Sequence, residues 1–218
     1  MPLMSPRFSI DLSVSTVILV SIVLCMGACN DAAETGWGDR KGALDTLALT
    51  DFRRAKDSAM RGEGSPIPRA MRAGFTGLRY FPPNPDLVFD LELQRLARPE
   101  SIDIQATGGD LRKARRLGYF RFSVNGAPCS LAAYELAESP GVLFVPFHDR
   151  TNGHESYEGG RYVDAQPDGG RYRLDFNYAY NPYCAYDSGY TCPRVPAENR
   201  LALPIRAGET APPVKSSL

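Results

Sequence analysis

Alternation of apolar and polar residues dominates the middle of the chain and predicts a β-rich domain. Residues 87–93 carry leucine or phenylalanine at every second position, and 117–124 alternate in the same way. This period of two is typical of strands with one buried face. Asn125-Gly126, directly after the second run, is a strong signal for a two-residue hairpin turn. Similar runs predict further strands at 101–106, 129–136, 141–147, 161–165, 171–176 and 201–206.

A helical spacing of apolar residues precedes this region, at 44–61. Gly62 and Gly64 follow it and are expected to end the helix, and 63–68 is interpreted as a linker. One leading helix, followed by about seven short strands without βαβ alternation, predicts a mainly β fold. We expect an antiparallel barrel or a sandwich. The apolar stripe of the helix is expected to consist of Leu44, Leu47, Ala48 and Phe52.

The N-terminus has the pattern of a bacterial lipoprotein signal. Its apolar stretch, 12–24, is shorter than the ~20 residues that a membrane span needs. Gly27 and Ala28 then precede Cys29, and small residues before a cysteine suit a lipoprotein signal peptidase. We therefore expect residues 1–28 to be removed and Cys29 to be acylated. An uncleaved N-terminal anchor is the alternative.

This interpretation divides the chain and gives it a location. Residues 29–42 are interpreted as a tether, 43–209 as a single β-rich domain and 210–218 as a flexible tail. Lipid on Cys29 would bind the membrane on the periplasmic side of a bacterial cell envelope. Asn30, rather than Asp, after that cysteine favours the outer over the inner membrane under an enterobacterial-type sorting rule.

The overall charge narrows the range of partners. The 218-residue chain carries 25 basic and 25 acidic residues. A balanced charge provides no electrostatic footprint for nucleic acid, and no glycine-rich phosphate loop is present. We expect neither nucleic acid nor a cofactor, and a small-molecule ligand stays open.

Two cysteines lie close together in a tyrosine- and proline-rich loop. Cys184 and Cys192 are eight residues apart, and in an oxidising envelope such a pair is expected to form a local disulfide. Free structural thiols are the alternative, and a redox pair is less favoured because the spacing is not C-x-x-C. Cys129, in a predicted strand, is expected to be a small buried hydrophobic residue.

Both histidines of the chain lie in one polar segment, 147–161, after the most apolar predicted strand. Their spacing fits no helix face and no zinc-finger pattern. We favour a hairpin loop in which Asp149 caps backbone amides, without a metal. The metal hypothesis would use His148, Asp149, His154 and Glu155.

A second polar segment, 175–186, alternates Asp and Asn with aromatic residues. Its rings and amides are suited to line a pocket, and an irregular loop fastened by its own aromatics is the alternative. Cys184 as a nucleophile would need His148 or His154 nearby as a base. Serine catalysis lacks a nucleophile-elbow sequence.

Five different runs along the chain have distinctive sequences, at 73–82, 144–153, 156–162, 174–185 and 192–201. The most distinctive joins Asp-Phe-Asn to Asn-Pro-Tyr-Cys-Ala. In these runs the chain resembles the bacterial family known as domain of unknown function 1684, in its short, lipoprotein form. The resemblance covers 47–209 and implies no activity, because none is established for that family.

The resemblance also implies which polar residues are candidates for binding a ligand. The ligand-binding candidates are Arg79, Asp149, Thr151, Tyr157, Arg161, Asp175, Asn177, Tyr180 and Asn181. The family's motifs also emphasise Gly153, Gly160, Cys184 and Cys192. They emphasise neither histidine, which weakens the metal hypothesis.

Three functions are consistent with these residues. The favoured one is a non-catalytic binding domain with a polar-aromatic pocket, in which Arg161 would hold a carboxylate or phosphate. The second is a hydrolase or transferase with Asp149 or Asp175 as acid or base. The third is a purely structural lipoprotein, whose polar residues satisfy one another. In an antiparallel meander, Asp149, Arg161 and Asp175 should gather at one end of the sheet.

Overall fold

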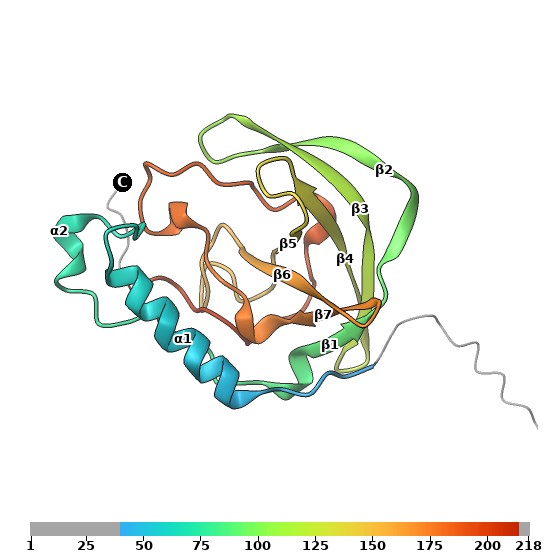
Figure 1. Ribbon diagram of the computed structural model, residues 1–218, viewed down its shortest axis with the longest axis horizontal. Helices are drawn as coiled ribbons and strands as arrows, with labels where there is room; N and C mark the ends of the chain where they lie inside the picture. Colours follow the sequence, from blue (N-terminus) through green and yellow to red (C-terminus); the bar gives the residue numbers. More distant parts are fainter. Residues whose placement is uncertain (1–39, 214–218) are drawn as a thin grey trace, which may run out of the picture. The chain divides into compact units, whose positions relative to one another are not determined.

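Seven strands and one long helix form the framework of the described part of the chain (Figure 1). The computed structural model describes residues 40–213, which belong to one compact unit, Thr35–Leu218. The predicted signal peptide, Cys29 and residues 214–218 lie outside the described residues. Among residues 40–213, no helix has the length and apolar character needed to cross a membrane. The elements are α1 (Thr46–Arg61), α2 (Arg69–Arg72), β1 (Val88–Leu91), β2 (Gln94–Gln105), β3 (Leu111–Val124), β4 (Ala127–Leu136), β5 (Leu143–Phe147), β6 (Arg161–Asp168) and β7 (Arg171–Asp175).

The strands form an antiparallel sheet in the order β1-β7-β6-β5-β4-β3-β2. From β2 to β7 each strand pairs with the next one along the chain, whereas β1 lies at the far edge beside β7. The sheet curls, so that the rings of Phe89 in β1 and Phe122 in β3 have centroids 4.8 Å apart. The result is a half-barrel (Figure 1). It confirms the prediction of a mainly β, antiparallel fold with one N-terminal helix.

The β3–β4 hairpin turns at the predicted dipeptide. Asn125 has a φ of 52° and Gly126 a φ of 77°. Both lie in the left-handed region, which glycine adopts freely and asparagine tolerates, so the local sequence is sufficient to specify this turn. Strands β2 and β3 extend beyond the predicted 101–106 and 117–124. Their additional residues are largely exposed and charged, and therefore carry no apolar alternation.

The strand predicted at 201–206 is absent, and this prediction was wrong. The segment has an irregular backbone, although Leu201 and Ile205 are buried in the core. The carbonyl groups of Ile205 and Ala207 accept hydrogen bonds from the guanidinium of Arg161 instead of pairing with another strand. The apolar pattern of this segment therefore reflects burial without strand pairing.

Both faces of the sheet are buried at β4, each beneath a different layer. Leu131 and Ala133 of β4 belong to the apolar cluster inside the curl, whereas Ala132 and Tyr134 alternate onto a second cluster on the outer face. The segment 193–200, which includes the short 3-10 helix η4 (Ala197–Asn199), crosses this outer face and hydrogen-bonds to β4 and β6. Its position between solvent and sheet creates the main cavity described below.

Helix α1 docks through two buried apolar residues and one ion pair, and the predicted apolar stripe does not form its buried face. Leu47 of that stripe is 79% exposed, and the buried positions are Leu49 and Met60. Between these two, Lys56 forms an ion pair with Glu209, with 2.6 Å between Nζ and Oε1. Because part of the docking face is charged, the apolar periodicity indicated the wrong side of the helix.

Candidate functional site

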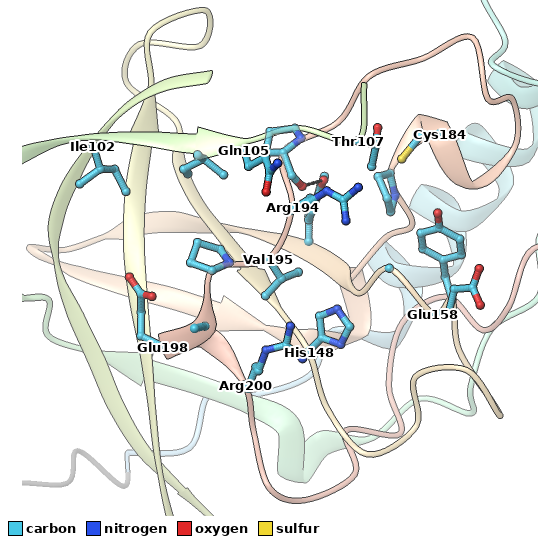
Figure 2. Close-up of a pocket in the computed structure, with 18 of the residues that line it drawn as sticks. Ile102, Gln105, Thr107, His148, Glu158, Cys184, Arg194, Val195, Glu198 and Arg200 are labelled. Atoms are coloured by element: carbon cyan, nitrogen blue, oxygen red, sulfur yellow. Dashed lines mark hydrogen bonds between the residues drawn. The ribbon is translucent and has the colours of Figure 1, made fainter. Parts of the chain in front are cut away.

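A cavity of about 820 Å³, the main cavity, lies between β2 and the segment 193–200 (Figure 2). Ile102 and Ile104 of β2 and Val195 of the segment contribute apolar walls. His148, immediately after β5, lines it from below in this view, beside Arg200. This volume and this mixture of apolar walls with a few polar groups are typical of small-molecule sites.

Asn199 holds the segment 193–200 in place over the sheet. Its buried amide donates hydrogen bonds to the carbonyls of Ala132 in β4 (2.9 Å) and Pro146 in β5 (2.7 Å). Its amide oxygen accepts the backbone N–H of Ala132 at 2.7 Å. One side chain thus joins two strands to an irregular segment and fixes one side of the cavity.

Two arginines on this segment supply positive charge to the main cavity. Arg194 and Arg200 are both exposed, with Val195 between them (Figure 2). Within the described residues, neither guanidinium forms an ion pair, and that of Arg194 makes only a 3.4 Å hydrogen bond to the carbonyl of Ala106. Both therefore retain donors for an external partner.

The acidic residues that line the main cavity are mostly neutralised. Asp103 pairs with Lys113 at 2.8 Å and Glu198 with Arg116 at 2.9 Å, and neither cation lines the cavity. Glu158 is the lining acid that has no ion pair within residues 40–213. Two unpaired arginines against one unpaired acid leave the cavity with an excess of positive charge.

His148 contributes a neutral imidazole to the cavity at neutral pH. Its burial lowers the pKa, and the positive charge of Arg200 lowers it further. Gly160 packs against this ring with a φ of +92°, and a Cβ there would lie 2.8 Å from the imidazole Cδ2. The close approach of the backbone therefore fixes the floor of the cavity. Among the described residues, no group of three His, Cys, Asp or Glu side chains is arranged to hold a metal ion.

Tyr157 is the ligand-binding candidate that lines the main cavity, and Cys184 and His148, which the sequence pairs as a possible nucleophile and base, line it too. Cys184 and Cys192 are free cysteines in this structure, and the backbone N–H of Cys184 lies 3.2 Å from the sulfur of Cys192. A hydrogen bond with the Cys192 thiol, together with those from Thr107 and Tyr157, lowers the pKa of Cys184 to about 7. The disulfide stays a prediction, for which the two residues are suitably close.

Asp149, Thr151 and Arg161 form a buried network at the end of β5 and the start of β6. The guanidinium of Arg161 donates to the Asp149 carboxylate at 2.8 Å and to the carbonyl of Ile205 at 2.7 Å. The second oxygen of Asp149 accepts the backbone N–H groups of Thr151 and Ile205. Asp149 and Arg161 meet across the β5–β6 connection, as predicted. Both side chains are 0% exposed, so in this conformation neither reaches a ligand.

Asn181 belongs to a neighbouring network centred on Glu209, which the sequence analysis did not identify. The Glu209 carboxylate accepts the backbone N–H of Asn181 at 2.8 Å and the hydroxyl of Tyr186 at 2.9 Å. It also receives the ion pair from Lys56. Arg79 is exposed and lines neither of the cavities discussed here.

Asp175 ends β7 in a separate network. Its carboxylate accepts the backbone N–H of Asn177 at 3.0 Å and pairs with Arg173 at 3.1 Å. The strand order places it toward the same end of the sheet as Asp149. Within the described residues its side-chain hydrogen bonds go to Arg173 and Asn177 rather than to Asp149 or Arg161. The three charged residues therefore form two networks.

A second cavity of about 370 Å³, the aromatic cavity, lies between α1 and the end of β7. The walls include Phe52, Asp164, Arg173, Asp175, Tyr178 and Tyr180. The polar-aromatic segment 175–186 contributes three of these residues, and its pattern suggested that it lines a pocket.

Arg194, Asn199 and Arg200, which define the main cavity, were not predicted from the sequence. They lie in an irregular segment that has neither period two nor a helical period, so no repeating pattern marks them. Pro193 and Pro196 were the available signal. Two closely spaced prolines limit the backbone and favour an ordered loop on the surface, where binding residues concentrate.

The fold and its cavities define a small half-barrel domain with a ligand-sized cavity on the outer face of the sheet, an architecture that does not imply one chemistry. Residues 73–210 match the family described as a protein of unknown function (DUF1684), and the chain belongs to this family. Helix α1 precedes the matched residues. The solution NMR structure of an uncharacterized protein from Haloarcula marismortui is similar, with 36% identity, a TM-score of 0.60, and coverage of 75% of this chain and 92% of that one. No curated protein matches.

Proposed function

We propose that the protein is a non-catalytic binding protein whose ligand is a small organic anion held in the main cavity. The supporting observation is the pair of unpaired guanidinium groups, Arg194 and Arg200, beside an apolar wall. A carboxylate or phosphate in the cavity would gain charge-assisted hydrogen bonds from such groups in the planar geometry that arginine favours.

The rest of the cavity indicates what else the ligand carries. Ile102, Ile104 and Val195 provide apolar contact, and the neutral His148 ring can donate or accept one hydrogen bond. A ligand with one anionic end and one apolar end fits these walls better than a bare inorganic ion. Binding would bury the apolar part at about 25 cal/mol per Å².

The anchoring of the domain rests on the sequence. Lipid on Cys29 would hold the protein on the periplasmic side of the envelope, at the outer membrane in preference to the inner. A Cys29→Ala variant should stay as the precursor or become soluble, as judged by fatty-acid labelling and membrane fractionation. Continued labelling and membrane association of that variant would refute lipidation at Cys29.

The alternatives differ in what they require of the carboxylates. A hydrolase or transferase needs Asp149 or Asp175 at the ligand, but neither lines the main cavity, and the side chain of Asp149 is wholly buried. The purely structural alternative is favoured by one observation, the complete burial of the Asp149–Arg161 pair. It predicts that the main cavity binds nothing.

Calorimetric titration of the full-length protein with citrate and with phenyl phosphate distinguishes these alternatives. We expect the wild type to bind at least one of them. Arg200→Gln should weaken that binding about tenfold, because it removes a hydrogen bond between charged groups. Arg98→Gln is the matched control, since Arg98 is an exposed arginine of β2 outside the cavity.

Failure of both anions to bind the wild type would contradict the proposal. Equal affinities of the wild type and Arg200→Gln would contradict it as well. Thermal unfolding of each variant checks that the fold is retained.

A further inference from the structure

We propose that the aromatic cavity is a second binding site, which takes a small organic cation of the methylated ammonium class. The site shares no residue with the main cavity and does not depend on the anion proposed for it. The site has three aromatic walls and one carboxylate, that of Asp164, which forms no ion pair within residues 40–213.

The walls come from two elements far apart in the sequence. Phe52 belongs to α1, and Tyr178 and Tyr180 follow β7. The rings of Phe52 and Tyr178 pack edge to face, with centroids 4.8 Å apart and planes at 61°. Several aromatic rings around one small space provide the arrangement that binds quaternary and methylated ammonium groups.

Two of these rings already interact with a cation of the protein itself. The Nζ of Lys56 lies 4.7 Å from the centroid of Tyr180 and 5.9 Å from that of Phe52. Its charge is paired with Glu209 at 2.6 Å, so Lys56 is held in place from outside the cavity walls. The contact shows that the Tyr180 ring is positioned for cation–π interaction.

The charges at the cavity leave one acid unmatched. Arg173 pairs with Asp175 at 3.1 Å and also donates to the carbonyl of Ala43. Asp164 forms no ion pair within residues 40–213, and the Tyr180 hydroxyl lies 3.2 Å from its carboxylate. Burial raises the pKa of Asp164 by more than the Tyr180 hydroxyl and the charge of Lys56 lower it, so its negative charge is only partly compensated. A bound cation would supply the missing charge.

The size and chemistry of the cavity restrict the ligand. A volume of about 370 Å³ accommodates a small molecule. A hard metal ion would need several oxygen ligands, whereas a single unpaired carboxylate among rings suits a soft, weakly hydrated monocation. Choline is therefore an appropriate probe, and 3,3-dimethyl-1-butanol is its neutral analogue of the same shape.

The test measures binding of both probes to the full-length protein by calorimetry, with saturation-transfer NMR as a second readout. We expect choline to bind and the neutral analogue to bind at least about tenfold more weakly. Asp164→Asn keeps the shape of the side chain and removes its charge, and should weaken choline binding about tenfold. Asp168→Asn, an exposed acid at the end of β6 outside the cavity, is the control and should not change it.

Phe52→Leu provides an independent variant, because Phe52 is 37% exposed and its loss should not prevent folding. It should weaken choline binding while leaving any binding of citrate or phenyl phosphate unchanged, which separates the two sites. The proposal is overturned if choline does not bind, or if the neutral analogue binds equally well. It is also overturned if both Asp164→Asn and Phe52→Leu keep wild-type affinity.

Discussion

Single buried polar residues hold the irregular parts of this fold. Asn199 satisfies backbone groups of two strands, and Arg161 satisfies the carbonyls of a third segment that has no strand to pair with. A buried backbone polar group without a partner costs free energy comparable to a lost hydrogen bond, so each of these side chains replaces several missing ladder bonds. These buried polar side chains therefore stabilise the fold.

Replacement of Arg161 by alanine tests this role. Arg161→Ala would leave the Asp149 carboxylate buried without its cation, and should lower the free energy of unfolding by about 3–5 kcal/mol. Urea denaturation measures the loss. Arg206→Ala, which removes an exposed ion pair with Glu155, is the control and should change stability little. Similar small losses in both variants would show that the buried pair is not structural.

His148 should make stability depend on pH. Its pKa in the folded chain is lowered below the ordinary value of 6.5. The unfolded chain therefore binds the proton more tightly, and the free energy of unfolding should fall as the pH drops below about 6.5 toward the folded pKa. His148→Gln should flatten this fall, as measured by urea denaturation between about pH 7.5 and 5. His154→Gln replaces the exposed histidine and should not flatten it; equal slopes in both variants would refute the assignment.

At the scale of elements, local signals were predictable and distant pairings were not. The Asn125-Gly126 turn and the alternation at the end of β3 are encoded within a few residues, so that hairpin was predicted correctly. The position of β1 beside β7 depends on contacts between segments far apart in the chain. The docking face of α1 depends on Lys56 meeting Glu209, which no period in the helix reveals.

The loop between Cys184 and Cys192 is the element whose chemistry is easiest to check. The two cysteines are close enough for the predicted disulfide, and closing a short loop contributes roughly 2–3 kcal/mol by the entropy model. Non-reducing peptide mapping of protein taken from the envelope should recover one cross-linked fragment. Recovery of two freely alkylated thiols would refute the disulfide.

Across the domain, a balanced total charge conceals two cavities of opposite character. The chain has a formal net charge of zero. The main cavity nevertheless has two arginines without ion pairs within residues 40–213, and the aromatic cavity has one such aspartate. Part of the aromatic cavity was predictable, because Asp175 and Tyr180 lie in one polar-aromatic segment. The main cavity was not predictable, since Arg194 and Arg200 line it only because Asn199 holds their segment over the sheet.

The central claim, that the main cavity holds an organic anion, is tested most directly by a crystal structure of the full-length protein with phenyl phosphate. We predict density for the phosphate between the guanidinium groups of Arg194 and Arg200, with the phenyl ring against Ile104 and Val195. An empty main cavity, or the ligand bound elsewhere on the domain, would contradict the account.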